Sequence, residues 1–136
     1  MEDKKENLRE TLQVKETILL ADDEEVITEV SRDILEMMGY KVLVAHNGRE
    51  AVDIYAGKKD DIDLIVQDMI MPGMSGEETF FALKKINPAV KVILSSGYMI
   101  NQQIEAVMGQ GCRAFIQKPF RMEDFSKIIR KVLDNP

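Results

Sequence analysis

Charged and hydroxyl side chains stand at the ends of four apolar runs of this sequence. The carboxylates of Asp22, Asp23 and Asp68, the hydroxyl of Ser96 and the ammonium of Lys118 each lie at or just beyond the end of such a run. If the runs are neighbouring parallel strands, these side chains meet at one edge of the sheet, where ligands bind in parallel α/β proteins.

Three carboxylates gathered in this way predict a cation site. Two carboxylates roughly 4 Å apart repel by about 4 kcal/mol when the effective dielectric is about 20, so such a group keeps a proton or binds a cation. Oxygen ligands beside a phosphate favour Mg²⁺. An aspartate there could attack phosphorus and give an aspartyl phosphate. Mg²⁺ and Lys118 would then neutralise the transferred group.

The stretch around Asp68 has the pattern of a strand followed by a tight loop and a helix. Ile62–Val66 is apolar apart from Asp63 and rich in branched residues, which is typical of a strand covered on both faces. Pro72-Gly73 and Gly76 mark the loop that precedes a helix. The pattern therefore places Asp68 at the mouth of a strand-to-helix loop.

The rest of the chain alternates between short apolar runs and helical patterns. The expected strands are 18–21, 42–45, 62–66, 90–94 and 114–116. The expected helices are 24–38, one beginning after Asn47, 76–86, 101–108 and a last helix with the apolar stripe Phe125, Ile128, Ile129, Val132 and Leu133. Five strands alternating with five helices predict an α/β fold, a parallel sheet with helices on both faces.

Two details of these helices can be checked directly against a structure. The first helix should bury Ile27, Val30, Ile34 and Met37, with Gly39 as its carboxyl-terminal cap. The second should begin at an Asn47 cap.

Composition indicates a single domain. The chain has 136 residues, of which 45% are hydrophobic and 31% charged, and we assign residues 17–136 to the domain. No apolar run approaches the roughly 18 residues that a membrane span needs, and no secretion signal stands at the N-terminus, so we expect a cytoplasmic protein without membrane contact. The net charge of −6 argues against nucleic-acid binding.

Residues 1–16 form a polar lead-in. Leu8, Leu12 and Val14 are its only apolar residues after Met1, which predicts a poorly ordered linker. The spacing of Leu8 and Leu12 also permits the tail of a helix from a preceding domain.

Four motifs, in this order and at these spacings, resemble the receiver domain of bacterial two-component response regulators. They are Asp22-Asp23, Asp68 with the following Met71–Gly76, Ser96-Gly97, and Lys118-Pro119-Phe120. The resemblance covers Thr17 to about Asp134. It implies the flavodoxin-like (βα)5 fold, a three-layer sandwich with strand order 2-1-3-4-5.

The resemblance also implies roles for these residues. Asp68 would be the phosphoacceptor, and Mg²⁺ would be bound by Asp23, Asp68 and the backbone carbonyl of Ile70, with Asp22 supporting the metal through water. Ser96 and Lys118 would contact the phosphoryl oxygens.

A switch and its partners follow from the same resemblance. Ser96 would move toward a phosphorylated Asp68, Phe115 would turn inward behind it, and the surface of Met99–Met108 and of the last helix would change. The Lys118-Pro119 bond would be cis. The partner would be a sensor histidine kinase or a phosphotransfer domain, with a homodimer as a further arrangement. The chain would be a self-phosphorylating module rather than an enzyme.

The sequence departs from the commonest receiver pattern at four positions. Ser96 replaces a threonine, Gly97 an alanine and Phe115 a tyrosine, while Gln67 places an amide where the strand is usually apolar. None removes a required functional group, but Phe115 lacks a hydroxyl for a switch that needs one. The segments TILLADDEE, SSGY and FIQKPF resemble receivers fused to the C-terminal side of sensor histidine kinases more than those that precede a DNA-binding domain.

Each motif, taken alone, also has a purely structural interpretation. Asp22, Asp23 and Glu24 could cap a helix, and Lys118 could be a solvated turn residue. His46 reads as an exposed loop residue.

Rival functions meet specific difficulties. A nucleotide- or flavin-binding protein needs a phosphate cradle after the first strand, where this chain has only carboxylates. An aspartyl phosphatase usually has its nucleophile after the first strand, with a second carboxylate two residues on, where Ile70 stands here relative to Asp68. A structural pseudo-receiver would typically lack Asp23, Asp68 or Lys118.

Overall fold

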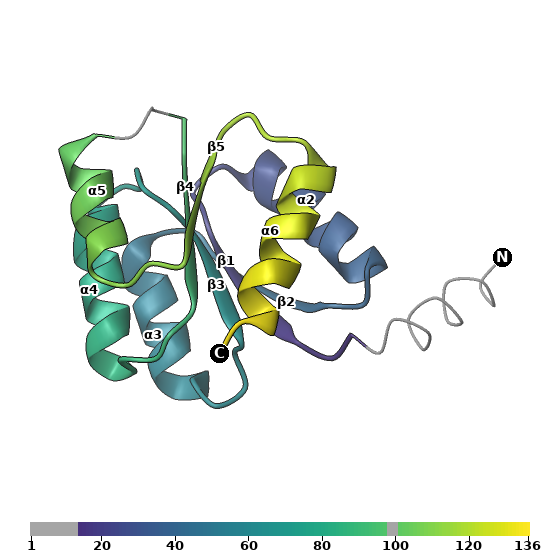
Figure 1. Ribbon diagram of the computed structural model, residues 1–136, viewed down its shortest axis with the longest axis horizontal. Coiled ribbons are helices and arrows are strands. Elements are labelled where there is room, and N and C mark those ends of the chain that lie inside the picture. Colours follow the sequence, from purple (N-terminus) through teal and green to yellow (C-terminus); the bar gives the residue numbers. More distant parts are fainter. Residues whose placement is uncertain (1–13, 98–100) are drawn as a thin grey trace, which may run out of the picture.

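A parallel sheet forms the centre of the protein. The computed structural model describes residues 14–97 and 101–136, and in them five strands are ordered β2-β1-β3-β4-β5 (Figure 1). The strands are β1 Thr17–Ala21, β2 Lys41–Ala45, β3 Leu64–Asp68, β4 Val92–Ser96 and β5 Ala114–Gln117. The predicted flavodoxin-like topology is confirmed. Strand order reverses between β1 and β3, which is where ligands bind in such sheets.

Helices cover both faces of the sheet. They are α2 Glu25–Met37, α3 Gly48–Lys58, α4 Gly76–Ile86, α5 Gln102–Gly109 and α6 Met122–Asp134. One apolar core lies between the sheet and α3, α4 and α5, and a second lies between the sheet and α2 and α6 (Figure 1). The central strands β3 and β4 are buried along their whole length, because helices cover them on both faces.

Two strands begin and end two residues later than predicted. The predicted strands 62–66 and 90–94 are observed at Leu64–Asp68 and Val92–Ser96. Asp68 pairs in register with Ser95 of the neighbouring strand, so ladder pairing continues through polar residues that are themselves buried. The apolar runs of the sequence indicate which residues are buried, whereas hydrogen-bonded pairing between parallel strands decides where each strand ends.

The inner face of α2 differs from the predicted one. Val30 and Met37, expected to face the core, are 52% and 55% exposed. The buried residues of α2 are Thr28, Ser31 and Leu35. The hydroxyl of Thr28 donates to the carbonyl of Glu25 at 2.9 Å, so a short polar side chain faces the sheet without an unmet hydrogen bond. Apolar residues are therefore left on the outside of α2.

Side-chain caps begin three of the helices. Asn47 accepts from the backbone N–H of Glu50 at 2.8 Å, as predicted, and Ser75 and Asn101 cap α4 and α5 in the same way. Gly39, with φ of 101°, follows the end of α2 in the left-handed conformation that favours glycine.

Part of the predicted lead-in and of the predicted switch segment lies outside the described residues. These parts are residues 1–13 and 98–100, which include Leu8, Leu12 and Met99. The described end of the lead-in contacts the domain, since Val14 packs against the core under α2 and α6. Within the described ranges no helix is both long and apolar enough to cross a membrane.

Candidate functional site

The carboxyl ends of the strands gather the predicted polar side chains. Asp22 follows β1 directly, Asp68 ends β3, Ser96 ends β4, and Lys118 follows β5. Asp22, Asp68 and Ser96 are buried, and the side chain of Lys118 is only 14% exposed. The sheet edge is therefore a place where charged groups are held away from water.

Lys118 joins the two strands that flank the reversal of strand order. Its Nζ lies 2.6 Å from Oδ2 of Asp22 and 3.3 Å from Oδ2 of Asp68, with Oε1 of Glu24 at 4.0 Å. The Lys118-Pro119 peptide bond is cis, as predicted, and the backbone N–H of Lys118 donates to the carbonyl of Ser96 at 2.7 Å. The ammonium thus lies between the carboxylates that the sequence proposed as neighbours.

Burial raises the pKa of Asp68. Removal from water is the largest cause, and it outweighs the charge of Lys118, which lowers the pKa, while the charge of Asp22 raises it further, to about 6. Hydrogen bonds from Lys118 and from the backbone amide of Ile70 also lower it. Asp68 is consequently ionised at neutral pH, yet it is a much stronger base than an ordinary aspartate.

Burial and the neighbouring carboxylates shift the pKa of Lys118 in opposite directions. Burial alone would lower the pKa of Lys118, but the hydrogen bond with Asp22 and the charges of Asp68 and Asp22 outweigh it, so the pKa is raised. Lys118 therefore remains a cation beside Asp68.

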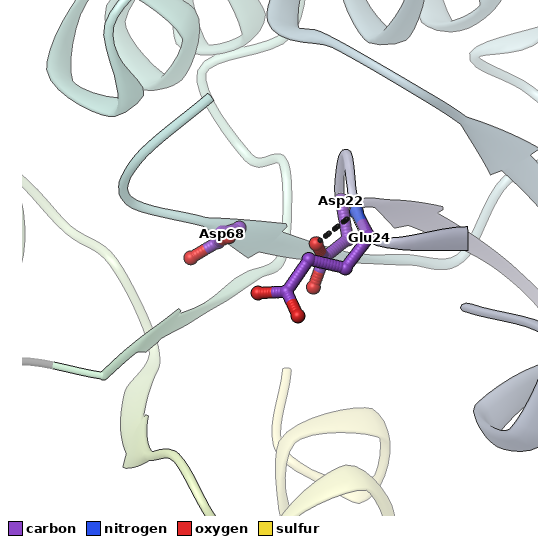
Figure 2. Close-up of side chains that lie close together, drawn as sticks. All are labelled: Asp22, Glu24 and Asp68. Atoms are coloured by element: carbon purple, nitrogen blue, oxygen red, sulfur yellow. Dashed lines mark hydrogen bonds between the residues drawn. The ribbon is translucent and has the colours of Figure 1, made fainter. Parts of the chain in front are cut away.

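The carboxylates that come together are not quite the predicted set. Oxygen atoms of Asp22, Glu24 and Asp68 lie within 4.8 Å of one another (Figure 2). Glu24, which the sequence suggested as part of a helix start, is indeed the residue before α2, but its side chain makes no cap hydrogen bond. Asp23 is exposed and lines the cleft beside this cluster.

Glu24 was missed as a candidate because its side-chain direction is set locally. The carboxylate of Asp22 accepts from the backbone N–H of Glu24 at 3.0 Å (Figure 2). This turn brings the side chain of residue 24 back toward the sheet edge. Its place two residues after Asp22 was the only signal in the sequence.

The chemistry of the donor set fits Mg²⁺. All three gathered side chains offer carboxylate oxygens, and Asp23 offers a fourth at the rim of the same cleft. Hard oxygen ligands are the ones that Mg²⁺ prefers. The cluster of Asp22, Glu24 and Asp68 could therefore hold a divalent cation.

The cleft over this cluster has an apolar wall. It encloses about 730 Å³, and its acidic floor includes Asp68. Its apolar lining comes from α2, the first residue of α6 and the neighbouring loops: Val26, Ile27, Val30, Ile70, Pro119, Phe120 and Met122. Val26 and Ile70 are 75% and 55% exposed, so this wall faces solvent. The arrangement suits a partner that brings an apolar surface to the acidic floor.

The predicted switch residues lie on neighbouring strands. Ser96 is buried at the end of β4, and Phe115 on β5 is half-buried and packs against the core under α3, α4 and α5. Phe115 pairs in register with Leu94, two residues before Ser96.

Cys112 and His46, the single cysteine and the single histidine of the sequence, lie outside this cluster of charged side chains. Burial raises the pKa of the Cys112 thiol to about 11. His46 is exposed in the loop after β2.

The comparisons with known proteins agree on one family. Residues 18–130 match the family model of the response regulator receiver domain. The transcriptional regulatory protein CpxR of Escherichia coli K12 is 32% identical over 118 residues, which are 85% of this chain and 48% of CpxR. The chain thus spans about half the length of this relative.

Solved structures agree with the family match. A response regulator receiver domain protein from Clostridium thermocellum has a TM-score of 0.83 and 30% identity, covering 88% of this chain and 94% of that one. The response regulator TrrA from Thermotoga maritima, solved in complex with Mg²⁺–BeF, has a TM-score of 0.76 and 28% identity, covering 86% and 98%.

Proposed function

Because the chain belongs to the response regulator receiver domain family, whose members are phosphoacceptor switches in two-component signalling, we propose that Asp68 is the residue that accepts the phosphoryl group. The observation that carries this proposal is the position of Asp68: a buried carboxylate at the end of β3, 3.3 Å from the Lys118 ammonium, under an open cleft. A phosphoryl donor can reach Asp68 from the cleft that this residue lines.

In the proposed reaction an oxygen of ionised Asp68 attacks phosphorus in line with the donor's leaving group. A P–O bond to Asp68 forms, the bond from phosphorus to the donor breaks, and its electron pair leaves with the donor. The pKa of about 6 leaves Asp68 deprotonated at pH 7 and therefore nucleophilic. Lys118 offsets the negative charge of the transferred group.

We assign Mg²⁺ binding to Asp22, Asp23, Asp68 and the Ile70 carbonyl, and Glu24 joins this set on the strength of its distance. Bound Mg²⁺ would neutralise phosphoryl oxygens. The support is the gathering of three carboxylates against a single lysine at the sheet edge. Asp22 is already engaged by Lys118, so its part would be to position the metal rather than to neutralise it alone.

Ser96 and Phe115 would carry the response. A phosphoryl group adds about 1.5 to 2 negative charges, and the Ser96 hydroxyl lies at the end of the strand next to Asp68. Movement of Ser96 toward it would open space along β4 and β5, into which Phe115 would turn. Without a ring hydroxyl, Phe115 would be held inward by packing alone, so a shifted population is expected rather than an all-or-none change.

The apolar wall of the cleft is the proposed docking surface for the phosphoryl donor. Its partner would be a sensor histidine kinase or a phosphotransfer domain whose helices cover Val26 and Val30 and present a phosphohistidine to Asp68. His46, the only histidine of the sequence, is exposed in the loop that follows β2, an edge strand separated from β3 and Asp68 by β1. The proposal also includes a cytoplasmic location and a domain that begins near Thr17. A homodimer and attachment to a sensor kinase are its remaining parts.

Uptake from a small donor tests the proposal. Wild-type protein incubated with acetyl phosphate should gain one acid-labile phosphoryl group in the presence of Mg²⁺ and none after chelation. Asp68→Asn should gain none. Asp61→Asn, a change of an exposed carboxylate before β3, is the matched control and should behave as wild type.

Two outcomes would contradict the proposal. Full modification of Asp68→Asn would place the acceptor elsewhere. Failure of the wild type to be modified with Mg²⁺ present would indicate a structural pseudo-receiver.

A further inference from the structure

One buried amide beside the site is only partly hydrogen-bonded. Gln67 immediately precedes Asp68 on β3 and is fully buried. Its Nε2 donates to the carbonyl of Gly76 at 2.6 Å, while its Oε1 has no hydrogen-bond partner among the described residues. An unmet buried acceptor weakens a fold, and a methionine would fill similar space without one.

Gly76, the partner of Gln67, closes the loop that follows β3. Its backbone N–H donates to the carbonyl of Met69 at 3.0 Å, and its own carbonyl accepts from Gln67. A side chain at Gly76 would collide with the Met69 backbone, so the two ends of the loop touch directly. The amide of Gln67 therefore ties the far end of the loop back to the strand that carries Asp68.

This loop carries the backbone of Ile70. The Ile70 amide hydrogen-bonds Asp68, and the side chain of Ile70 is exposed at the cleft. Beyond Ile70, the side chain of Met71 is buried in the core, whereas Pro72 and Gly73 are exposed and Gly73 adopts a φ of 81°. The placement of Ile70 therefore depends on Met71 and on how firmly the two ends of the loop are held.

We propose that Gln67 is a positioning residue, which fixes the Met69–Gly76 loop and so holds the Ile70 carbonyl where Mg²⁺ needs it. This inference rests on the metal site of the proposed function. It explains why an amide stands in the row Ala21, Gln67, Leu94 and Phe115, which is otherwise apolar across the sheet. The unpaired Oε1 of Gln67 costs free energy of folding, and the preorganised Ile70 carbonyl is the functional gain that offsets this cost.

The test compares Gln67→Met with wild type by Mg²⁺ titration, followed through the backbone amide signals of the loop. Loss of the tether should weaken Mg²⁺ binding on the order of tenfold, the lower range for groups that orient metal ligands. Hydrogen exchange at the Gly76 amide should become faster. The thermal midpoint should stay the same or rise, because the unmet acceptor is removed together with the donor.

Ile65→Met is the matched control. Ile65 lies two residues earlier on β3, faces the same core and is fully buried, but it does not contact the loop through a side-chain hydrogen bond. Its Mg²⁺ affinity and Gly76 exchange should match those of wild type. A purely structural role for Gln67 would instead lower the midpoint and leave Mg²⁺ affinity unchanged.

The outcomes separate this inference from the proposed function. Absence of Mg²⁺ binding by the wild type would refute the proposed metal site. Binding by the wild type with equal affinity in Gln67→Met would overturn the role of Gln67 alone. If the variant fails to fold, the wild type decides: the side-chain amide protons of Gln67 should exchange slowly and lie close to Gly76, and rapid exchange would overturn the tether.

Discussion

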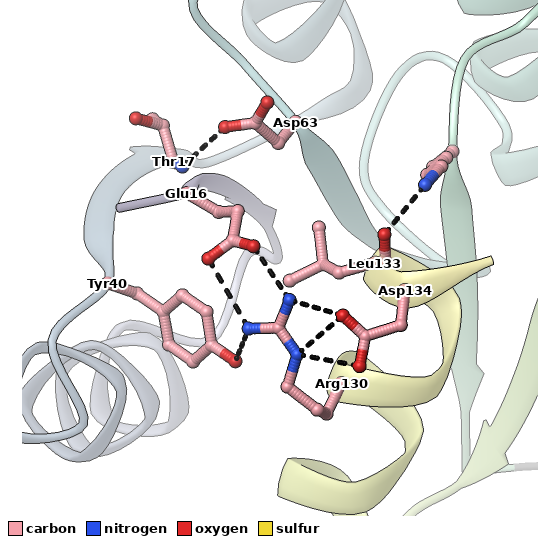
Figure 3. A network of polar contacts seen from close by, with 8 residues as sticks. Glu16, Thr17, Tyr40, Asp63, Arg130, Leu133 and Asp134 are labelled. Carbon is pink, nitrogen blue, oxygen red and sulfur yellow. Dashed lines mark hydrogen bonds and ion pairs between the residues drawn. The ribbon is translucent and has the colours of Figure 1, made fainter. Parts of the chain in front are cut away.

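Opposite ends of the sheet each hold a cation among carboxylates, but the pKa values of these carboxylates are shifted in opposite directions. At the amino end Arg130 contacts Glu16 and Asp134, each at 2.7 Å, and Tyr40 at 3.4 Å (Figure 3). At the carboxyl end Lys118 contacts Asp22 and Asp68. Arg130 lowers the pKa of Glu16 and of Asp134 through hydrogen bonds, whereas the pKa of Asp68 is raised by burial despite Lys118.

Burial and donor geometry account for the difference. The side chains of Arg130 and Glu16 are 38% and 26% exposed, and a guanidinium offers five donors in a fork that matches two carboxylates. The side chains of Lys118 and Asp68 are 14% and 8% exposed, and one ammonium faces three carboxylates. The amino end stabilises the fold, while the carboxyl end holds charge that a metal or a phosphoryl group can rearrange.

Of the substitutions that test this comparison, removal of the Lys118 ammonium should have the largest effect on the free energy of unfolding. Lys118→Met leaves buried carboxylates without their cation, which costs about 3 to 5 kcal/mol for buried pairs. Urea unfolding at pH 7 should show this loss, and much of it should return at pH 5, where Asp68 takes up a proton. Lys127→Met, which breaks an exposed pair with Glu123, is the control and should cost less than about 1 kcal/mol. Equal losses in the two variants would contradict the contrast in burial.

Neutralising Asp68 should stabilise the protein. A pKa raised from 3.8 to about 6 means that the protonated form contributes stability below pH 4 that is lost as pH rises to 6. Asp68→Asn should therefore exceed wild type at pH 7 by on the order of 2 to 3 kcal/mol, and the advantage should vanish below pH 4. Chemical unfolding from pH 3.5 to 7.5 measures this, and a variant less stable than wild type at pH 7 would refute a strained site.

Arg130 should show the opposite pH dependence. The lowered pKa of Glu16 means that its contribution is present above the ordinary glutamate pKa and is lost as pH falls through the lower folded value. Arg130→Met should cost about 1 kcal/mol at pH 7, discounted for its exposure, and less at pH 3.5. Phosphoryl uptake should not change. Arg32→Met, in the exposed pair with Glu36, serves as control. A loss that grows in acid would contradict this role.

The substitution with the smallest expected effect on stability tests the apolar wall of the cleft separately from its charged floor. Val30→Ser should change the free energy of unfolding by no more than about 0.5 kcal/mol, because Val30 is half exposed. Transfer from a phosphohistidine donor should slow severalfold, while uptake from acetyl phosphate stays unchanged. Met37→Ser, on the same helix but outside the cleft lining, is the control. Equal slowing by both variants would show that donor docking does not depend on this wall.

Much of the fold was predictable because hydrophobic period and caps act locally. The bounds of α4 agree with Gly76–Ile86, and the Asn47 cap was evident from residue type alone. The ends of β3 and β4 were not, because pairing between strands distant in sequence carries them through polar residues. Of the four residues predicted to line the inner face of α2, Ile27 and Ile34 are half-buried, but Val30 and Met37 are exposed, because apolar spacing cannot tell a core stripe from an exposed one.

The site was predictable as a group of residues rather than as a geometry. Strand ends indicated that Asp22, Asp68 and Lys118 would meet, and they do. Glu24 joined the cluster through a turn held by Asp22, and Gln67 met Gly76 through a closed loop. Both contacts depend on side-chain directions that spacing does not encode.

Chemical mapping of the phosphorylated residue tests the central claim most directly. Borohydride reduces an aspartyl phosphate to homoserine, so wild-type protein treated with acetyl phosphate and Mg²⁺ and then reduced should carry homoserine at position 68 when its peptides are sequenced by mass spectrometry. Homoserine at position 22 or 23, or a phosphoryl group retained on His46, would contradict the assignment of Asp68.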